Sequence, residues 1–157
     1  MENLNRQLLT NGFKFNDDLK IGTKKTLPEK IVQFGEGNFL RAFVDYMFDE
    51  INEQGLFEGG ITLIQPIPGG DFLRNVLNEQ EGLYTLIARG REDGKEVAAK
   101  RLITCVNRCI NPYVDLDTYN TCAKNPELRF VVSNTTEAGI SWKEEDMVTD
   151  QPQDSFP

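Results

Sequence analysis

Two glycines separated by one residue, Gly35 and Gly37, are the positions whose type and spacing most directly indicate chemistry in this sequence. They follow a short apolar segment and directly precede a stretch with helical periodicity. In this order the first glycine makes a tight turn, and the second lacks a Cβ, so that a pyrophosphate can approach the backbone. The start of the helix then offers unpaired N–H groups and a partial positive charge. The spacing therefore predicts a site for the phosphates of a dinucleotide.

The spacing alone also fits an ordinary strand–turn–helix with two turn glycines, because Leu40 replaces the third glycine of the G-x-G-x-x-G pattern. Two charged residues of the loop bear on the phosphate hypothesis. Arg41 can donate charge-assisted hydrogen bonds to a phosphate, and the alternative is that its side chain is only solvated. Glu36 is unfavourable beside a pyrophosphate, so we expect its side chain to point away and only its N–H to face the ligand.

Two further segments are expected at the same edge of the sheet, because ligands of such folds bind beyond the carboxyl ends of the strands. Gln65 ends a second apolar segment, where an acidic residue commonly accepts hydrogen bonds from the adenosine ribose, and Asp71 lies a little further on. A third apolar segment is followed by a polar group that we expect at the nicotinamide-ribose end: Asn134, Thr135, Thr136 and Glu137. The alternative for this group is a local turn that caps the strand.

The elements that must position these residues follow from hydrophobic periodicity. Residues 31–34 are expected as a strand, residues 38–54 as a helix, and residues 61–65 as a second strand. Asn38 is the expected N-cap of the helix, and Gly55 lies where a C-terminal stop is expected. The helix carries one apolar face, which consists of Phe39, Ala42, Phe43, Tyr46, Met47 and Ile51. This β-α-β unit should have a right-handed crossover.

The middle of the chain predicts a different arrangement. Residues 83–89 and 97–107 are β-like and are joined by a charged turn with Asp93-Gly94, the pattern of an antiparallel hairpin. A brief helix capped by Asp71 precedes the hairpin, a helix over residues 115–124 follows it, and residues 128–133 are expected as a buried strand of the main sheet. The predicted fold is therefore α/β, a Rossmann-like and mostly parallel sheet with an inserted antiparallel hairpin.

Three segments together resemble the mannitol dehydrogenase family, the long-chain polyol and uronate dehydrogenases. They are Gly-x-Gly-Asn-Phe-x-Arg-Ala at 35–42, Leu-Tyr-Thr at 83–85, and a strand that leads into Thr-Glu-x-Gly at 136–139. The resemblance implies a main NAD contact made by Ile31, Val32, Gln33, Phe34, Gly35, Glu36, Gly37, Asn38, Phe39, Leu40, Arg41 and Ala42.

The resemblance further implies hydride transfer between NADH and a small sugar acid. The alternatives are the same chemistry on mannitol or fructuronate, or a nucleotide-binding module without catalysis. NAD is expected over NADP, because the family implies it and no arginine directly follows Gln65 to hold a 2′-phosphate.

Members of the resembled family are longer, with a mostly helical catalytic domain after the nucleotide-binding domain. We therefore expect residues 1–28 to be an N-terminal extension with a solvated charged turn at 20–25, and residues 29–142 to be an incomplete Rossmann-like NAD-binding domain. Residues 143–157 are expected as a polar tail or linker towards a catalytic domain. The family's lysine, asparagine and histidine that act on the carbonyl come from beyond residue 157, so we assign no catalytic residue and expect this chain alone to be inactive.

Composition excludes several other functions. Seventeen basic and twenty-five acidic residues give a net charge of −8, and an acidic surface repels nucleic acid. No apolar run approaches the roughly 20 residues of a membrane span, and the first residues do not form a signal peptide, so we expect a soluble cytoplasmic protein. Three cysteines without any histidine do not make a zinc site, and no metal is expected.

Overall fold

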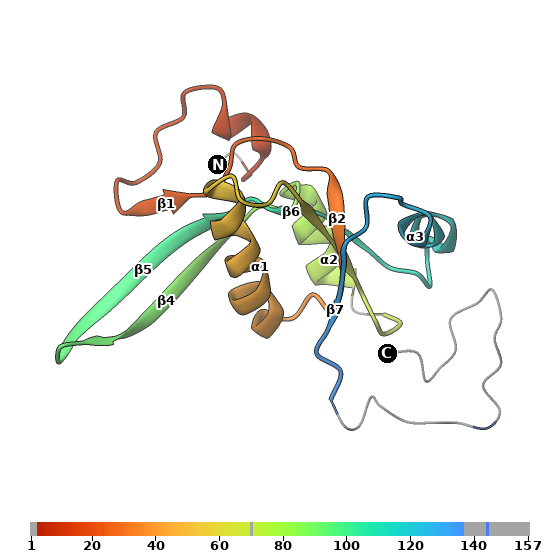
Figure 1. Cartoon of the computed structure of the whole chain (residues 1–157). Helices are drawn as coiled ribbons and strands as arrows, with labels where there is room; N and C mark the ends of the chain where they lie inside the picture. The colour runs from red at the N-terminus through yellow and green to blue at the C-terminus, as the bar shows by residue number, and fades with distance from the viewer. Residues whose placement is uncertain (1–2, 70, 137–143, 145–157) are drawn as a thin grey trace.

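The computed structural model describes residues 3–69, 71–136 and 144, which form two sheets with helices packed around them (Figure 1). The main sheet has the strand order β6-β3-β2-β7, and every pair in it is parallel. Its strands are β2 (Glu29–Phe34), β3 (Gly60–Ile64), β6 (Val106–Ile110) and β7 (Phe130–Ser133). Taken in chain order, these four strands have the spatial order 3-2-1-4, which is the first part of the Rossmann order. The predicted α/β fold is confirmed.

The second sheet has the order β1-β5-β4 and contains the predicted hairpin. Strands β4 (Tyr84–Glu92) and β5 (Lys95–Ile103) pair antiparallel and project from the body of the molecule (Figure 1). Asp93 and Gly94 both have positive φ angles, 50° and 77°, as a two-residue hairpin turn requires. The structure also confirms helices near the two predicted positions, α2 (Asp71–Glu79) and α3 (Leu116–Ala123), with Asp115 capping α3.

The prediction of one strand over residues 97–107 is wrong. This segment contains parts of two strands, which belong to two different sheets. Strand β5 ends at Ile103, and β6 begins at Val106 and runs parallel to β3. The break is made by Asp49 of α1 (Asn38–Glu53), whose Oδ1 accepts hydrogen bonds from the N–H groups of Thr104 (2.7 Å) and Cys105 (3.0 Å). A side chain therefore satisfies the backbone where the chain passes from one sheet to the other.

Helix α1 does not bury the face that its apolar residues predicted. Phe39, Phe43 and Met47 are 63%, 49% and 48% exposed. The buried residues of the helix are instead Leu40, Asp45, Asp49 and Asn52. The predicted N-cap is also wrong, because Gly37 occupies that position, whereas the C-terminal stop is confirmed by Gly55 with a φ of 70°.

A short strand in the N-terminal residues was not predicted. Strand β1 (Leu19–Ile21) pairs parallel with β5, in part of the segment expected as a solvated turn. The 3₁₀ helix η1 (Arg6–Leu9) also packs here, and its Arg6 Nη2 donates to the carbonyls of Thr104 (2.9 Å) and Val106 (2.8 Å). The division of the chain at residue 28 stays a prediction, but residues on both sides of it share these contacts.

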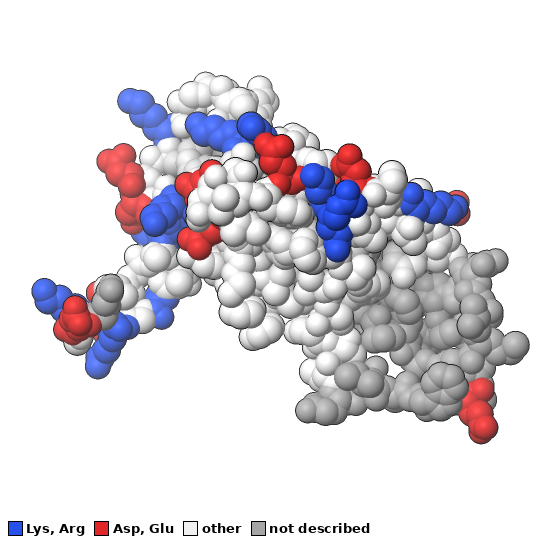
Figure 2. Space-filling model, viewed as in Figure 1, with Lys and Arg blue, Asp and Glu red and all other residues white. Residues whose placement is uncertain are grey.

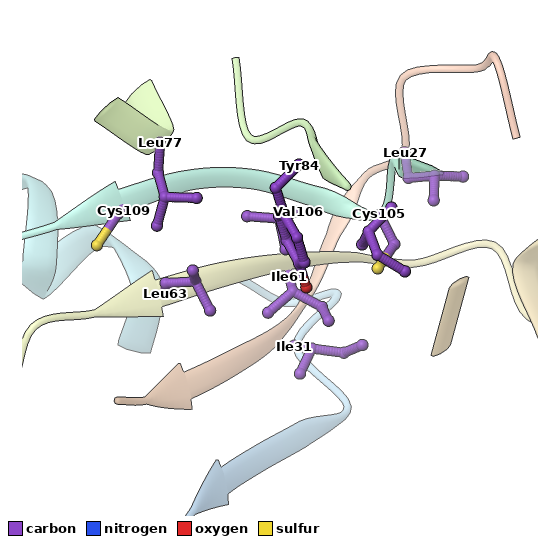
Figure 3. Close-up of a cluster of buried hydrophobic side chains, with 10 residues drawn as sticks. Leu27, Ile31, Ile61, Leu63, Leu77, Tyr84, Cys105, Val106 and Cys109 are labelled. Carbon is purple, nitrogen blue, oxygen red and sulfur yellow. The ribbon is translucent and has the colours of Figure 1, made fainter. Parts of the chain in front are cut away.

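The largest buried apolar cluster lies where the main sheet meets α2 and the start of the hairpin (Figure 3). It includes Ile31, Ile61, Leu63, Leu77, Tyr84 and Val106. Strand β7, expected to be buried, is instead an edge strand with Phe130 48% and Val131 64% exposed. The cluster therefore supports the centre of the sheet, from which the loop after β2 emerges.

The outer surface mixes charges of both signs. On the face drawn in Figure 2, lysine and arginine side chains alternate with aspartate and glutamate along the rim and the hairpin tip. In the part of the chain that the structure describes, no helix is long and apolar enough to cross a membrane.

We predict that Asp49→Asn lowers the free energy of unfolding by about 3 kcal/mol or more, because it removes the buried charged partner of Arg101 and leaves the guanidinium paired only with the half-exposed Glu53. Arg101 Nε lies 2.7 Å from Asp49 Oδ2, and the two side chains are 5% and 0% exposed. Urea denaturation measures the change. The matched control is Glu53→Gln, which removes the other partner of Arg101 at a site that is 48% exposed and should cost less than about 1 kcal/mol. Equal losses in the two variants would contradict the role given to Asp49.

Candidate functional site

The loop between β2 and α1 has the tight turn that its glycines predicted. Gly35 has a φ of 110° and donates its N–H to the Ile64 carbonyl of β3 at 2.9 Å. A Cβ on Gly35 would lie 3.3 Å from Asn134 Oδ1 and 3.4 Å from the side chain of Leu40. Both the positive φ and the crowding therefore favour glycine here. The same contact shows that the structure brings Asn134, after β7, beside the loop.

Gly37 is the residue where the helix begins and where the space is open. It has a φ of −68° and a ψ of 166°, and a Cβ built on it would meet no atom within 4 Å. The first N–H groups of the helix, those of Asn38, Phe39 and Leu40, have no acceptor within the helix. An anion placed over Gly37 would meet these donors and the positive end of the helix dipole.

Side chains hold two carbonyl groups of the loop. Gln33, which is fully buried in β2, donates from Nε2 to the Gly35 carbonyl at 3.2 Å. Arg41 donates from Nε to the Glu36 carbonyl at 2.8 Å and from Nη2 to Asn38 Oδ1 at 2.6 Å. Arg41, predicted as a phosphate donor, thus uses two nitrogens to shape the loop, and a contact with phosphate stays a prediction.

The two residues predicted near the ribose have different surroundings. Gln65 is buried, and its Nε2 donates to the carbonyls of Ile67 and Gly69, so its amide holds the loop after β3. Asp71 Oδ1 accepts from Asn111 Nδ2 at 2.9 Å and pairs with Arg74 Nε at 3.2 Å. A ribose contact by either residue stays a prediction, and Asp71 is the less buried of the two.

The polar group after β7 forms a local turn of the kind given above as its alternative interpretation. Thr135 donates its N–H to Ser133 Oγ at 3.3 Å, and the two hydroxyl oxygens lie 2.6 Å apart. Thr136 is exposed, and Glu137 lies outside the described residues. Of this group, Asn134 is the residue that the structure places against the glycine loop.

Sequence reasoning missed two buried polar residues under the loop, Asp45 and Tyr84. The Tyr84 hydroxyl oxygen lies 2.9 Å from both the Arg41 carbonyl and Asp45 Oδ2. The Arg41 guanidinium carbon lies 5.2 Å from the centre of the Tyr84 ring, within the range of a cation–π contact. Two features of the sequence could have indicated these residues. They are the position of an aspartate within the apolar stretch of α1 and the tyrosine of the Leu-Tyr-Thr segment.

Burial changes the proton affinity of these groups. Loss of solvent raises the pKa of Asp45 to about 7, although hydrogen bonding from Tyr84 opposes this shift. Burial and the nearby Asp45 also raise the pKa of Tyr84 well above its ordinary value. Asp45 is therefore a carboxyl that can hold a proton near neutral pH.

The cysteines are buried free thiols in the structure, and burial raises the pKa of Cys105, Cys109 and Cys122. Cys105 is fully buried in the apolar core. Within the described residues, no group of three or more histidine, cysteine, aspartate or glutamate side chains could hold a metal ion.

Comparison with known proteins gives relatives that share one name. The chain is 52% identical over 131 residues to the altronate oxidoreductase of Yersinia enterocolitica, and 45% identical over 130 residues to that of Bacillus subtilis. Each match covers 83% of this chain and 27% of the relative, so the chain spans about a quarter of the length of these proteins.

Two solved structures have a similar fold. The Pseudomonas fluorescens mannitol 2-dehydrogenase in a ternary complex with NAD and D-mannitol matches with a TM-score of 0.74 at 24% identity, over 88% of this chain and 27% of that one. A substrate-free D-sorbitol dehydrogenase matches with a TM-score of 0.75 at 20% identity, over 90% of this chain and 29% of that one.

A family model described as the mannitol dehydrogenase Rossmann domain matches residues 29–154, which is most of the chain. The match includes the glycine loop, the hairpin and β7, the three regions in which the sequence motifs lie. The predicted family is confirmed, and the chain belongs to the mannitol dehydrogenase family.

Proposed function

We propose that this chain binds NAD and is the cofactor-binding part of an oxidoreductase that transfers a hydride between NADH and a sugar acid. The proposed substrate pair is tagaturonate and altronate, in the breakdown of hexuronates in the cytoplasm. The observation that carries the proposal is the loop from Gly35 to Arg41, in which open space, free helix N–H groups and a turn glycine coincide. The name shared by relatives at 45% and 52% identity supports the substrate.

Mannitol or fructuronate is the alternative substrate within the family. The fold similarity to mannitol and sorbitol dehydrogenases favours a polyol, but it comes at 24% and 20% identity, where only the fold is informative. The higher identity to altronate oxidoreductases therefore favours the sugar acid.

Backbone groups and side chains would have different roles in NAD binding. The N–H groups at the start of α1 would bind the pyrophosphate, and Gly37 would allow it to approach. Gln33 and Arg41 hold the carbonyls of Gly35 and Glu36 and would thereby keep these oxygens from turning towards the phosphate. Asn134 would contact the nicotinamide end, and Asp71 would accept from the adenosine ribose. The bound NADH supplies the hydride.

We predict that Gly37→Val weakens NAD binding at least about tenfold, or about 1.4 kcal/mol, because the new side chain would occupy the space left for the pyrophosphate. The backbone angles of Gly37 suit any residue, so folding should not change. Calorimetric titration of NAD measures the affinity. Gly90→Val is the matched control, because a Cβ there also meets no atom within 4 Å but lies on the hairpin. The assignment fails if both variants bind NAD as tightly as the unchanged protein.

We also predict a preference for NAD over NADP that depends on Asp71. Its carboxylate would repel a 2′-phosphate, and it holds the guanidinium of Arg74, the nearest cation after β3. Asp71→Asn should remove the repulsion and release Arg74, which improves NADP binding relative to NAD by about tenfold. Binding of both cofactors to Asp71→Asn and to the control Asp117→Asn, on an exposed part of α3, tests this. An unchanged cofactor ratio in Asp71→Asn would contradict it.

The last expectation concerns turnover. The sequence has no histidine, and its lysines do not lie in the matched motifs, so we assign no residue of this chain to protonate or polarise a substrate carbonyl. We therefore predict that the chain binds NADH without oxidising it in the presence of tagaturonate, fructuronate or fructose. NADH absorbance followed over time measures this. Sustained oxidation with any of the three would show that a catalytic group within these residues was missed.

A further inference from the structure

We propose that Asp45 and Tyr84 are positioning residues for the loop from Gly35 to Arg41, the cofactor loop. A proton shared between the two side chains keeps this loop in the shape that binds NAD. Loss of that proton from Asp45 weakens NAD binding. This inference rests on the proposed NAD binding, which it extends by naming the groups that control the affinity and its dependence on pH.

The number of protons around the Tyr84 hydroxyl bears on the protonation state of Asp45. The Tyr84 hydroxyl lies 2.9 Å from two acceptors, the Arg41 carbonyl and Asp45 Oδ2, but it has one proton to donate. Both contacts can be full two-centre hydrogen bonds at the same time only if a second proton is on Asp45, which then donates to the Tyr84 oxygen while Tyr84 donates to the Arg41 carbonyl. The geometry therefore fits a neutral Asp45.

The burial of the Asp45 carboxyl group also bears on its protonation state. Asp45 is fully buried, and its Oδ1 makes no hydrogen bond of good geometry within the described residues, although the nearby Gln33 amide favours the ionised form. An ionised carboxylate with an unpaired oxygen is costly to bury, whereas the carbonyl oxygen of a neutral acid costs less. The surroundings thus favour the same protonation state as the hydrogen-bond count.

Arg41 connects Asp45 and Tyr84 to the cofactor loop. Arg41 is held by Tyr84 through its carbonyl and through the aromatic face under its guanidinium. The same guanidinium donates to the Glu36 carbonyl, and thereby fixes the residue that lies between the two glycines. Tyr84 is the first residue of β4. It therefore acts on the cofactor loop through Arg41 and would not touch the cofactor.

Asp45 is the group in this cluster that titrates near neutral pH. Burial raises its pKa to about 7; hydrogen bonds from Tyr84 and Gln33 and the positive charge of Arg41 oppose this shift, and the like charge of Asp49 adds to it. Two further titratable groups that face it, a tyrosine and a cysteine, do not lose their protons in this range. The pKa values of Tyr84 on β4 and of Cys105, whose Sγ donates to the Asp45 carbonyl at 3.3 Å, are both raised well above their ordinary values. Gln33 on β2 does not titrate.

The direction of the effect follows from these contacts. When Asp45 ionises, the Tyr84 proton turns to the carboxylate, and the Arg41 carbonyl loses its donor. The new negative charge also lies about two turns along α1 from the loop, where it opposes an anionic ligand. NAD affinity should therefore be highest below the pKa of Asp45 and should fall as the pH rises through about 7.

The test is calorimetric titration of NAD at about pH 6 and about pH 8.5, with the ordinary protein and three variants. We expect the ordinary protein to bind about fivefold more weakly at the higher pH. Tyr84→Phe should weaken binding about fivefold at the lower pH, because it removes the donor to Arg41. Asp45→Asn cannot ionise, and its affinities at the two pH values should agree within about twofold.

Tyr46→Phe is the matched control, because it removes a tyrosine hydroxyl from α1, the helix that carries Asp45. This hydroxyl donates to Glu50 and not to the loop. Its affinities should equal those of the ordinary protein, and thermal melts confirm that each variant is folded. The pH comparison of the ordinary protein needs no variant. If that protein binds NAD equally at both pH values, or if Tyr84→Phe binds like Tyr46→Phe, the inference is overturned while NAD binding stands. If it does not bind NAD at all, the proposed function fails as well.

Discussion

One buried carboxylate, Asp49, determines how the two sheets meet. It accepts hydrogen bonds from the backbone of Thr104 and Cys105 and from the guanidinium of Arg101, all at the point where β5 ends and β6 begins. Gly22 lies so close that a Cβ there would overlap the carboxylate and the Thr104 hydroxyl. Without this side chain, two buried N–H groups would lack acceptors, which costs about 1–3 kcal/mol each. The position of the hairpin relative to the main sheet depends on this interaction.

The same carboxylate explains why hydrophobic periodicity indicated the wrong face of α1. Periodicity assigns the buried side of a helix by its apolar residues, and it placed Phe39 and Phe43 inside. The helix instead turns Asp45, Asp49 and Asn52 towards the protein, because their partners are supplied by segments far away in the chain. No local pattern in residues 38–53 contains that information.

Much of the fold could nevertheless be predicted from local signals. The apolar segments gave three strands of the main sheet, β2, β3 and β7, and Asp93-Gly94 gave the hairpin, because these features are set by neighbouring residues. The break at Thr104 was missed because neither it nor Cys105 is a residue type that ends strands. In the site, the glycine loop was predictable from its spacing, and Tyr84 was not, because its role depends on how the hairpin packs on α1.

The buried polar residues also resolve an apparent conflict between charge and ligand. The chain carries a net charge of −8, yet its candidate ligand is an anion. The attraction must therefore come from backbone dipoles at the start of α1, which act over short distances and are weakened by any negative charge behind them. An ionised Asp45 would be such a charge, since its helix begins at the loop. A proton on Asp45 removes that charge and keeps the carboxyl able to hydrogen bond, so that the residue supports the loop without opposing its ligand.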